Sequence, residues 1–328
     1  MASPTGLEVV DLATGRTVGE ESARGEALRS DAEDDTLPPV LAGGAEVLAP
    51  FLLTVPASGT HTAGAMVELV AVSATAPHKG TWRTTVKLPE WALTANSVTV
   101  AAVGAHDGTA VVTVVGGDEA VSYGIDTASH ALRWRKDGLE AVQVSTGTVT
   151  GLLHGEPRTP SPVGLELATG SEKWRGAKVY AAYMDAAGPS TLRIAGRKPD
   201  GTKTDQLLDV STGRLRADMP PGLGTVTCTY DQAQTLVCPH AFAVVAVDPA
   251  TGQLLWVIKD GEGGRRAPTV TAVWHGRVYG LGANGPVALD ARTGTDLPTK
   301  PEAAPLLVDA YAGLVLDAGR LTSYPAGG

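Results

Sequence analysis

Two cysteines are the residues of this 328-residue chain whose spacing most directly indicates chemistry. Cys228 and Cys238 lie in TVTCTYDQAQTLVCPH, a pattern that predicts a hairpin centred on Ala233. Directly opposed residues of such a hairpin have Cα atoms about 4.5–5.5 Å apart, which suits a disulfide. The alternative is two independent buried thiols. A disulfide in so short a loop contributes about 2–3 kcal/mol and indicates an oxidising compartment, so we expect an extracytoplasmic chain whose signal or membrane anchor has been removed upstream.

Metal chemistry has weak support in the sequence. The histidines form no H-x-H, H-E-x-x-H or Cys-His cluster, so no zinc site is predicted. The acidic run Asp31, Glu33, Asp34 and Asp35 lacks the glycine and terminal glutamate of a calcium loop, and a solvated linker is the better interpretation. The seven histidines are His61, His78, His106, His130, His154, His240 and His275.

Catalytic and nucleic-acid-binding patterns are weak as well. No serine lies in a G-x-S-x-G setting, and GLGANG at 280–285 is followed by no helical pattern, so a turn is expected there rather than a phosphate loop. The net charge of −9 argues against a nucleic-acid partner, and Arg265-Arg266 is too short a basic cluster. We therefore predict no catalytic residues, no cofactor, no metal and no nucleic-acid partner. A membrane would be reached only through an upstream anchor, because no run of 18 apolar residues exists.

The elements that position these residues follow from an internal repeat. Imperfect copies of an acidic residue followed by Thr-Gly or a close variant recur along the chain, as in VDPATG, and from Asp126 onward the acids recur at intervals of 40, 43, 39 and 42 residues. A period near 40 without a helical pattern is typical of a β-propeller with one small sheet per repeat. The repeat residues are Asp11, Gly15, Asp126, Trp134, Glu166, Gly170, Trp174, Asp209, Gly213, Asp248, Gly252, Trp256, Asp290 and Gly294.

Each position of the motif has a physical task. The segment before the acid is apolar and β-branched, which predicts a buried strand. The acid and Thr accept hydrogen bonds from turn amides, and Gly adopts the left-handed conformation that most residues resist. The predicted result is a tight turn between the third and fourth strands of a blade. A Trp eight residues after the acid would pack on the adjacent blade.

We therefore predict an all-β chain, residues 1–328, that forms a single propeller of four-stranded antiparallel blades. Residues 40–302 would form six blades, and 303–328 part of a closing blade that residues 1–19 complete, which closes the ring through both chain ends. Residues 20–39 are interpreted as an acidic linker. Seven blades are favoured and eight remain possible.

These copies resemble the PQQ-like β-propeller repeat of quinoprotein alcohol dehydrogenases, BamB-like lipoproteins and extracytoplasmic domains of actinobacterial membrane proteins, some of them Ser/Thr kinases. The resemblance is carried by residues 248–252 with Trp256, 166–170 with Trp174, and 290–294. For the quinoprotein enzymes it implies a quinone over a calcium ion, held by acidic and amide side chains beside an adjacent-cysteine disulfide. This chain departs from that pattern, because Cys228 and Cys238 are not adjacent and the only Asn residues are Asn96 and Asn284.

Function is expected at long loops that join second to third strands, since binding residues concentrate on loops carried by a rigid scaffold. These loops are 154–162 and 196–205, the segment 55–64 is a third contributor to the same face, and the alternative is tolerated insertion. We predict a non-catalytic extracytoplasmic scaffold or sensor domain of a membrane-anchored protein, which binds a protein, peptide or small ligand. The alternative is a PQQ-dependent dehydrogenase with a degenerate site. The candidate binding residues are Glu156, Arg158, Arg197, Lys198, Asp200 and Lys203.

Overall fold

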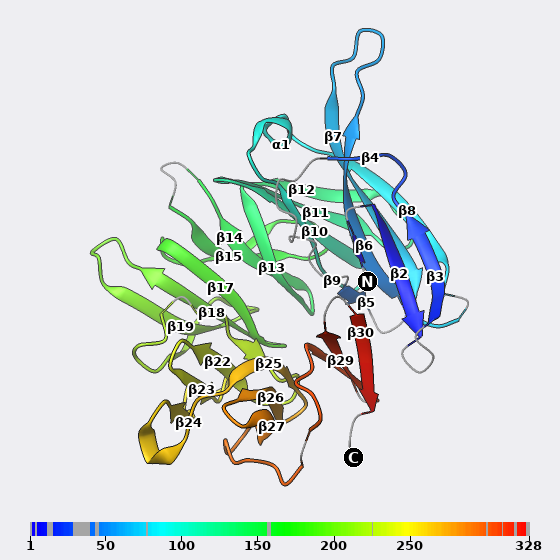
Figure 1. The fold of residues 1–328 in the computed structure, drawn as a ribbon. Helices are drawn as coiled ribbons and strands as arrows, with labels where there is room; N and C mark the ends of the chain where they lie inside the picture. Colours follow the sequence, from blue (N-terminus) through cyan, green and yellow to red (C-terminus); the bar gives the residue numbers. More distant parts are fainter. Residues whose placement is uncertain are drawn as a thin grey trace. The chain divides into compact units, whose positions relative to one another are not determined.

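The computed structural model describes residues 2–3, 5–11, 16–28, 40–42, 46–76, 78–155, 159–224, 226–299, 301–309, 311–317 and 320–325. These residues form short antiparallel sheets with a single four-residue α-helix (Figure 1). They divide into two compact units, the first reaching Lys178 and the second beginning at Val179.

The first unit contains four of the sheets found in the described residues, with strand orders β1-β2-β3, β4-β6-β7-β8 with β5 paired to β6, β12-β11-β10-β9 and β13-β14-β15-β16. The strands are β1 (Ala2–Ser3), β2 (Gly6–Asp11), β3 (Arg16–Ser22), β4 (Glu26–Ala27), β5 (Val40–Ala42), β6 (Glu46–Val55), β7 (Gly64–Ser73), β8 (Gly80–Lys87), β9 (Thr99–His106), β10 (Thr109–Gly116), β11 (Glu119–Asp126), β12 (Leu132–Asp137), β13 (Leu139–Ser145), β14 (Thr148–Leu153), β15 (Ser161–Glu166) and β16 (Glu172–Arg175), and the helix is α1 (Trp91–Thr94).

The second unit contains the other four sheets of the described residues, with orders β17-β18-β19-β20, β21-β22-β23-β24, β25-β26-β27 and β28-β29-β30. The strands are β17 (Tyr180–Gly188), β18 (Thr191–Arg197), β19 (Lys203–Asp209), β20 (Leu215–Asp218), β21 (Thr229–Tyr230), β22 (Leu236–His240), β23 (Ala243–Val247), β24 (Leu254–Lys259), β25 (Thr269–Trp274), β26 (Arg277–Gly282), β27 (Gly285–Asp290), β28 (Leu307–Val308), β29 (Ala312–Asp317) and β30 (Arg320–Pro325), with one 3₁₀ turn, η1 (Glu262–Gly264).

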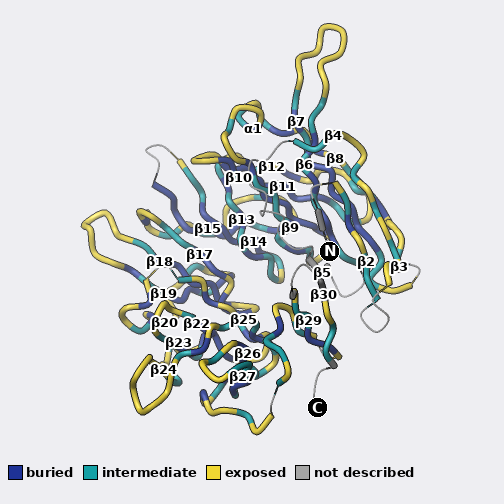
Figure 2. The backbone as a smooth tube through the Cα atoms, viewed as in Figure 1, coloured by how far each residue is buried: buried dark blue, intermediate teal, exposed yellow. Residues whose placement is uncertain are grey.

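Burial is greatest in the middle strands of the sheets and decreases toward the fourth strands and the hairpin turns (Figure 2). Nearly every residue of β10 is buried, whereas in β16 and β20 no residue is fully buried. This gradient explains why the segments before each acidic motif residue are continuously apolar, because a strand covered on both faces cannot alternate with polar residues. The predicted all-β architecture of four-stranded antiparallel sheets is confirmed.

The N-terminal segment differs from its interpretation as a linker. Residues 20–22 belong to β3 and Glu26–Ala27 forms β4, whereas 29–39, which include the acidic run 31–35, lie outside the described residues. The carboxylate of Glu21 accepts a hydrogen bond from the Gly80 amide at 2.6 Å and forms an ion pair with Arg83. Arg83 also contacts the buried Glu68 at 3.2 Å. Acidic composition indicated a solvated segment, but the contacts of Glu21 with β8 of the neighbouring sheet give this carboxylate a structural role.

The last sheets also differ from the prediction in detail. The expected fourth strand after Asp290 is reduced to a single bridge between Leu289 and Asp296, because Pro298 has no amide hydrogen to continue the ladder. The N-terminal and C-terminal strands of the described residues belong to separate three-stranded sheets. Closure of the ring by both chain ends, and the choice between seven and eight blades, stay predictions.

Candidate functional site

The acidic motif residues act as turn anchors. Oδ1 of Asp126 accepts the amides of Ala128 and Ser129 at 2.9 and 2.7 Å, and Oδ1 of Asp290 accepts those of Arg292 and Thr293 at 2.9 and 2.8 Å. The Asp126 turn lies between the third and fourth strands of its sheet, whereas the Asp290 turn follows the third strand and leads to the single bridge at Asp296. Asp11 ends β2, while Gly15 lies outside the described residues.

Basic side chains complete the anchors at Asp126, Asp209 and Asp248. Hydrogen bonds from the Ser129 amide and from Arg133 keep the pKa of Asp126 well below its usual value. Burial would raise the pKa of Asp209, but Arg216 at 2.5 Å and the neighbouring hydroxyls lower it well below that value. Asp248 has no basic residue at the corresponding position, and Arg292 from the next repeat contacts it at 2.8 Å. These carboxylates have structural partners and are poor candidates for catalysis.

Two of the motif tryptophans, Trp134 and Trp256, link neighbouring sheets, each within its own unit. Trp134 donates from Nε1 to the Leu167 carbonyl at 2.8 Å, and Trp256 donates to Ala291 at 2.9 Å. A Cβ on Gly170 would lie 2.8 Å from Cγ of Trp134, and Gly170 has φ of 69°. Glycine is therefore required at position 170 for two reasons: its positive φ, and the space that the Trp134 ring occupies beside it.

The first complete sheet uses a variant of the same contact. Trp82 stacks on the imidazole of His130, with ring centroids 5.0 Å apart and planes at 13°. His130 occupies the glycine position of its motif and has φ of 60°. His130 therefore has a packing role as well as a turn conformation.

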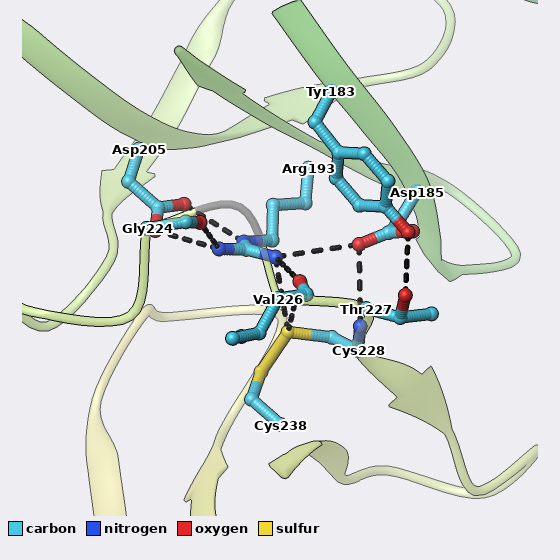
Figure 3. Close-up of a disulfide and its surroundings, with 9 residues drawn as sticks. All are labelled: Tyr183, Asp185, Arg193, Asp205, Gly224, Val226, Thr227, Cys228 and Cys238. Atoms are coloured by element: carbon cyan, nitrogen blue, oxygen red, sulfur yellow. Dashed lines mark hydrogen bonds and ion pairs between the residues drawn. A yellow bond between two sulfur atoms is a disulfide. The ribbon is translucent and has the colours of Figure 1, made fainter. Parts of the chain in front are cut away.

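Cys228 and Cys238 form a disulfide in the second unit, with Cα atoms 4.2 Å apart (Figure 3). Thr229 pairs with Val237 and Tyr230 with Leu236, so the two cysteines occupy the next opposed position, as the predicted register requires. Asp231 fixes the turn, because its Oδ1 accepts three amides of residues 233–235 at 2.8–2.9 Å.

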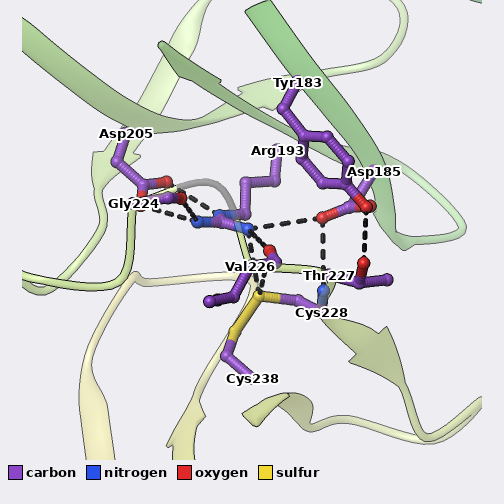
Figure 4. Close-up of polar contacts among 9 residues, drawn as sticks. All are labelled: Tyr183, Asp185, Arg193, Asp205, Gly224, Val226, Thr227, Cys228 and Cys238. Atoms are coloured by element: carbon purple, nitrogen blue, oxygen red, sulfur yellow. Dashed lines mark hydrogen bonds and ion pairs between the residues drawn. A yellow bond between two sulfur atoms is a disulfide. The ribbon is translucent and has the colours of Figure 1, made fainter. Parts of the chain in front are cut away.

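A fully buried arginine lies beside the disulfide. The side chain of Arg193 has no exposed surface, and its Nε and Nη2 atoms donate to the two carboxylate oxygens of Asp205 at 2.8 and 2.7 Å (Figure 4). Nη1 lies 3.3 Å from Asp185 and 3.2 Å from Sγ of Cys228. The same guanidinium donates to the carbonyls of Gly224 and Val226, both at 2.6 Å. Such a bidentate pair is rigid as well as strong.

Asp185 is the less well compensated carboxylate of this cluster. Burial raises its pKa above the usual value, against the opposing effects of the Cys228 amide and Arg193. Tyr183, on the same strand, donates to the Thr227 hydroxyl at 2.8 Å, and burial raises its pKa as well. We refer to Arg193, Asp185, Asp205 and the Cys228–Cys238 disulfide as the Arg193 cluster.

A cavity of about 570 Å³ lies directly beside the Arg193 cluster. It is formed by the β18–β19 hairpin and the segment after β20, and Asp205 and Gly224 belong to both the cavity wall and the contacts of Arg193. The volume lies within the range of small-ligand sites. The cavity is lined by Ala181, Gly196, Arg197, Lys198, Lys203, Thr204, Asp205, Gln206, Asp218, Pro220, Pro221, Gly222 and Gly224.

The cavity brings together Arg197, Lys198 and Lys203, three of the predicted binding residues. Asp200 instead caps the hairpin turn, because its Oδ1 accepts the Thr202 amide at 2.9 Å, and this contact lowers its pKa. The hairpin joins the second and third strands of its sheet, as does the 55–64 loop between β6 and β7. In the third loop, 154–162, Glu156 and Arg158 lie outside the described residues.

A second cavity of about 610 Å³ is lined by Arg265, Arg266 and Asn284 among others. Arg265 is already paired with Asp296 at 2.9 Å. Within the described part of the chain, no group of three His, Cys, Asp or Glu side chains is arranged to hold a metal ion, and no helix is long and apolar enough to cross a membrane.

Sequence reasoning missed Arg193 and Asp185. Arg193 lies between Leu192 and Ile194 in a middle strand. A charge in a strand buried on both faces must find a partner, so its place in TLRIAGR was a usable signal. The identity of the partner was not, because Asp205 opposes Ala195 rather than Arg193 in the strand register.

Comparison with known proteins shows the fold. No protein-family model and no curated protein matches the sequence. Among solved structures, BamB from Moraxella catarrhalis is 17% identical, with a TM-score of 0.50 over 92% of this chain and 91% of that one. Apo AztD from Citrobacter koseri is 12% identical, with a TM-score of 0.53 over 98% of this chain and 86% of that one. Both are β-propellers, and at these identities the likeness shows a propeller fold alone.

Proposed function

We propose that this chain is a non-catalytic binding scaffold that works outside the cytoplasm and holds a peptide segment of a partner protein in the cavity beside the β18–β19 hairpin. The observation that carries the proposal is the cavity itself. Three exposed cationic residues line it, and they lie on a hairpin that joins the two middle strands of a propeller sheet. Binding residues are commonly loop residues presented by a rigid scaffold.

The Arg193 cluster supports this use of the cavity by fixing its wall. Arg193 holds Asp205 on the hairpin and the carbonyl of Gly224 on the opposite segment. A wall that is already ordered loses less conformational freedom when a ligand binds. The buried charges of this blade thus help to order the cavity wall.

The disulfide supports the location. Cys228–Cys238 closes a loop with a sequence separation of 10 and lies against a buried guanidinium. Structural disulfides are typical of secreted and envelope proteins. The same proposal includes attachment of the protein to a membrane through an upstream segment. This is the architecture of the actinobacterial membrane proteins whose repeat the chain resembles.

The proposal is tested by panning a phage library of random dodecapeptides against the purified chain. The matched variant replaces residues 198–202 by Asn-Gly. Because Arg197 and Lys203 are paired in the ladder, a two-residue turn preserves the register while removing the loop. Selected peptides should bind the wild type and lose affinity for the shortened hairpin. Equal binding to both, or no enrichment, would contradict the proposal.

Two controls accompany the panning. An equivalent shortening of residues 56–63, between the paired Val55 and Gly64, should leave binding unchanged. Pyrroloquinoline quinone with calcium should leave the unfolding midpoint unchanged, whereas a ligand at about 100 times its dissociation constant adds about 2.7 kcal/mol. A saturable, calcium-dependent rise would argue for the dehydrogenase alternative.

A further inference from the structure

Asn284 is an exposed asparagine directly before a glycine. It lies at the tip of the β26–β27 hairpin, where Gly282 and Gly285 form the last pair of the ladder. Its side chain makes no hydrogen bond with any residue that the structure describes. The amide group can therefore rotate toward the backbone that follows it.

Gly285 leaves the approach to its own nitrogen open. Its φ is 111°, and a Cβ built at this position would meet no atom within 4 Å. Glycine has no side chain to hinder the neighbouring nitrogen, and the end of a ladder opens more readily than its interior. The Gly285 nitrogen is thus well placed to reach Cγ of Asn284.

Other sequences of similar type lack this combination. The only other asparagine, Asn96, precedes Ser97, which has a side chain. The chain also has four Asp-Gly sequences, but each of their carboxylates accepts a hydrogen bond of 2.8–3.1 Å, and an ionised carboxylate is a poor target for a nitrogen nucleophile. These carboxylates are those of Asp107, Asp137, Asp200 and Asp260.

We propose that Asn284-Gly285 is a self-modification site, at which the asparagine deamidates without an enzyme. The Gly285 nitrogen attacks Cγ of Asn284, the Cγ–Nδ2 bond breaks, and ammonia leaves with the proton of the Gly285 amide. Water then opens the cyclic imide at either of its carbonyls, which yields aspartate or β-linked isoaspartate. The reaction needs no oxidant, reductant or cofactor.

The reaction adds a negative charge to the second cavity, which Asn284 lines together with Arg265, Arg266 and Asp296. Asp296 pairs with Arg265 at 2.9 Å, and Arg266 makes no ion pair with any residue that the structure describes. A carboxylate at position 284 is ionised at neutral pH, so the lining then holds equal numbers of cationic and acidic side chains. The site thus changes the charge of this surface as the protein ages.

The test is peptide mapping by mass spectrometry after incubation of the folded chain at neutral and at mildly alkaline pH. Asn284 should convert about tenfold faster than Asn96, because Ser97 has a side chain and Gly285 has none. The rate should rise with pH, since the attacking nitrogen must lose its proton. Isoaspartate should form beside aspartate, because the imide opens at both carbonyls. Conversion no faster than that of Asn96, or aspartate without isoaspartate, would overturn the inference.

Two variants separate the sequence from its structural setting. Ser97→Gly creates a second Asn-Gly sequence at an exposed position, and its Asn96 should react as Asn284 does. If Asn96 of this variant reacts and Asn284 does not, the hairpin protects Asn284 and the inference fails. In Asn284→Gln, acidic species on ion-exchange chromatography should accumulate far more slowly, because glutamine forms a larger ring. Accumulation at the wild-type rate would place the reaction elsewhere.

The charge change has its own test in Asn284→Asp, which reproduces one of the two products. At low salt this variant should keep or slightly raise the unfolding midpoint of the wild type, because the new carboxylate lies in a cavity with two cations. High salt should remove any gain, since it screens exposed charges. A lower midpoint at low salt would overturn the proposed charge balance in the cavity.

Discussion

Replacing Arg193 by methionine tests the central packing argument. Methionine has a similar length but no donors, so Asp205 loses a bidentate partner and the carbonyls of Gly224 and Val226 lose bonds of 2.6 Å. Removing one partner of a buried ion pair costs about 3–5 kcal/mol. At an unfolding entropy of about 2.1 cal/mol/K per residue, the whole chain should show a drop in midpoint of ~4–7 °C.

The assays are thermal unfolding, which gives the midpoint, and urea unfolding, which gives the free energy, both followed by tryptophan fluorescence and far-ultraviolet circular dichroism. Asp185→Asn is the matched variant, because burial raises the pKa of Asp185 and the amide keeps an oxygen for Arg193 and the Cys228 amide. A raised folded pKa means that Asp185 favours folding fully below its unfolded pKa and loses this contribution as the pH rises through the folded value. At neutral pH, Asp185→Asn should therefore cost far less than Arg193→Met. Equal losses, or a loss below about 1 kcal/mol in Arg193→Met, would refute the reasoning.

Three further predictions concern the motif and the disulfide. Because the folded pKa of Asp209 is lowered, this carboxylate stabilises the fold above its unfolded pKa, and the stabilisation is lost as the pH falls through the folded pKa. Asp209→Asn should therefore flatten the loss of stability below about pH 4. Urea unfolding from neutral to acidic pH measures this. The double variant Cys228→Ser with Cys238→Ser should lower the free energy of unfolding by about 2–3 kcal/mol. Dithiothreitol should lower the stability of the wild type by the same amount and should leave the stability of the double variant unchanged. Gly294→Ala should cost more than Gly276→Ala, because both have positive φ but only at Gly294 would a Cβ lie 2.6 Å from the Trp256 ring; equal midpoints would contradict the interlocking contact.

The repeat made the sheets predictable from sequence. The acid, the glycine and the apolar strand before them are local signals, so the turns after Asp126, Asp209 and Asp248 fall between third and fourth strands as expected. The register of the cysteine hairpin was predictable for the same reason, because a short antiparallel pair is fixed by its turn.

Other features depend on contacts between segments far apart in sequence. Glu21 was interpreted as part of a linker, since its partners Arg83 and Gly80 lie about 60 residues away. The Arg193 cluster likewise draws together four strands and a loop. The side chain of Arg193 reaches Asp205, which is its diagonal neighbour and not its directly opposed partner in the ladder. The hairpin was predictable as a long loop, but the cavity beside it was not, because the segment after β20 completes its wall.

Hydrogen–deuterium exchange of the chain with a panned peptide is the most direct test of the binding site. The account predicts slower exchange in residues 196–205 and 218–224 when the peptide is bound, with little change at residues 260–266 beside the second cavity. Protection confined to residues outside the hairpin and the segment after β20 would contradict the assignment of the binding site.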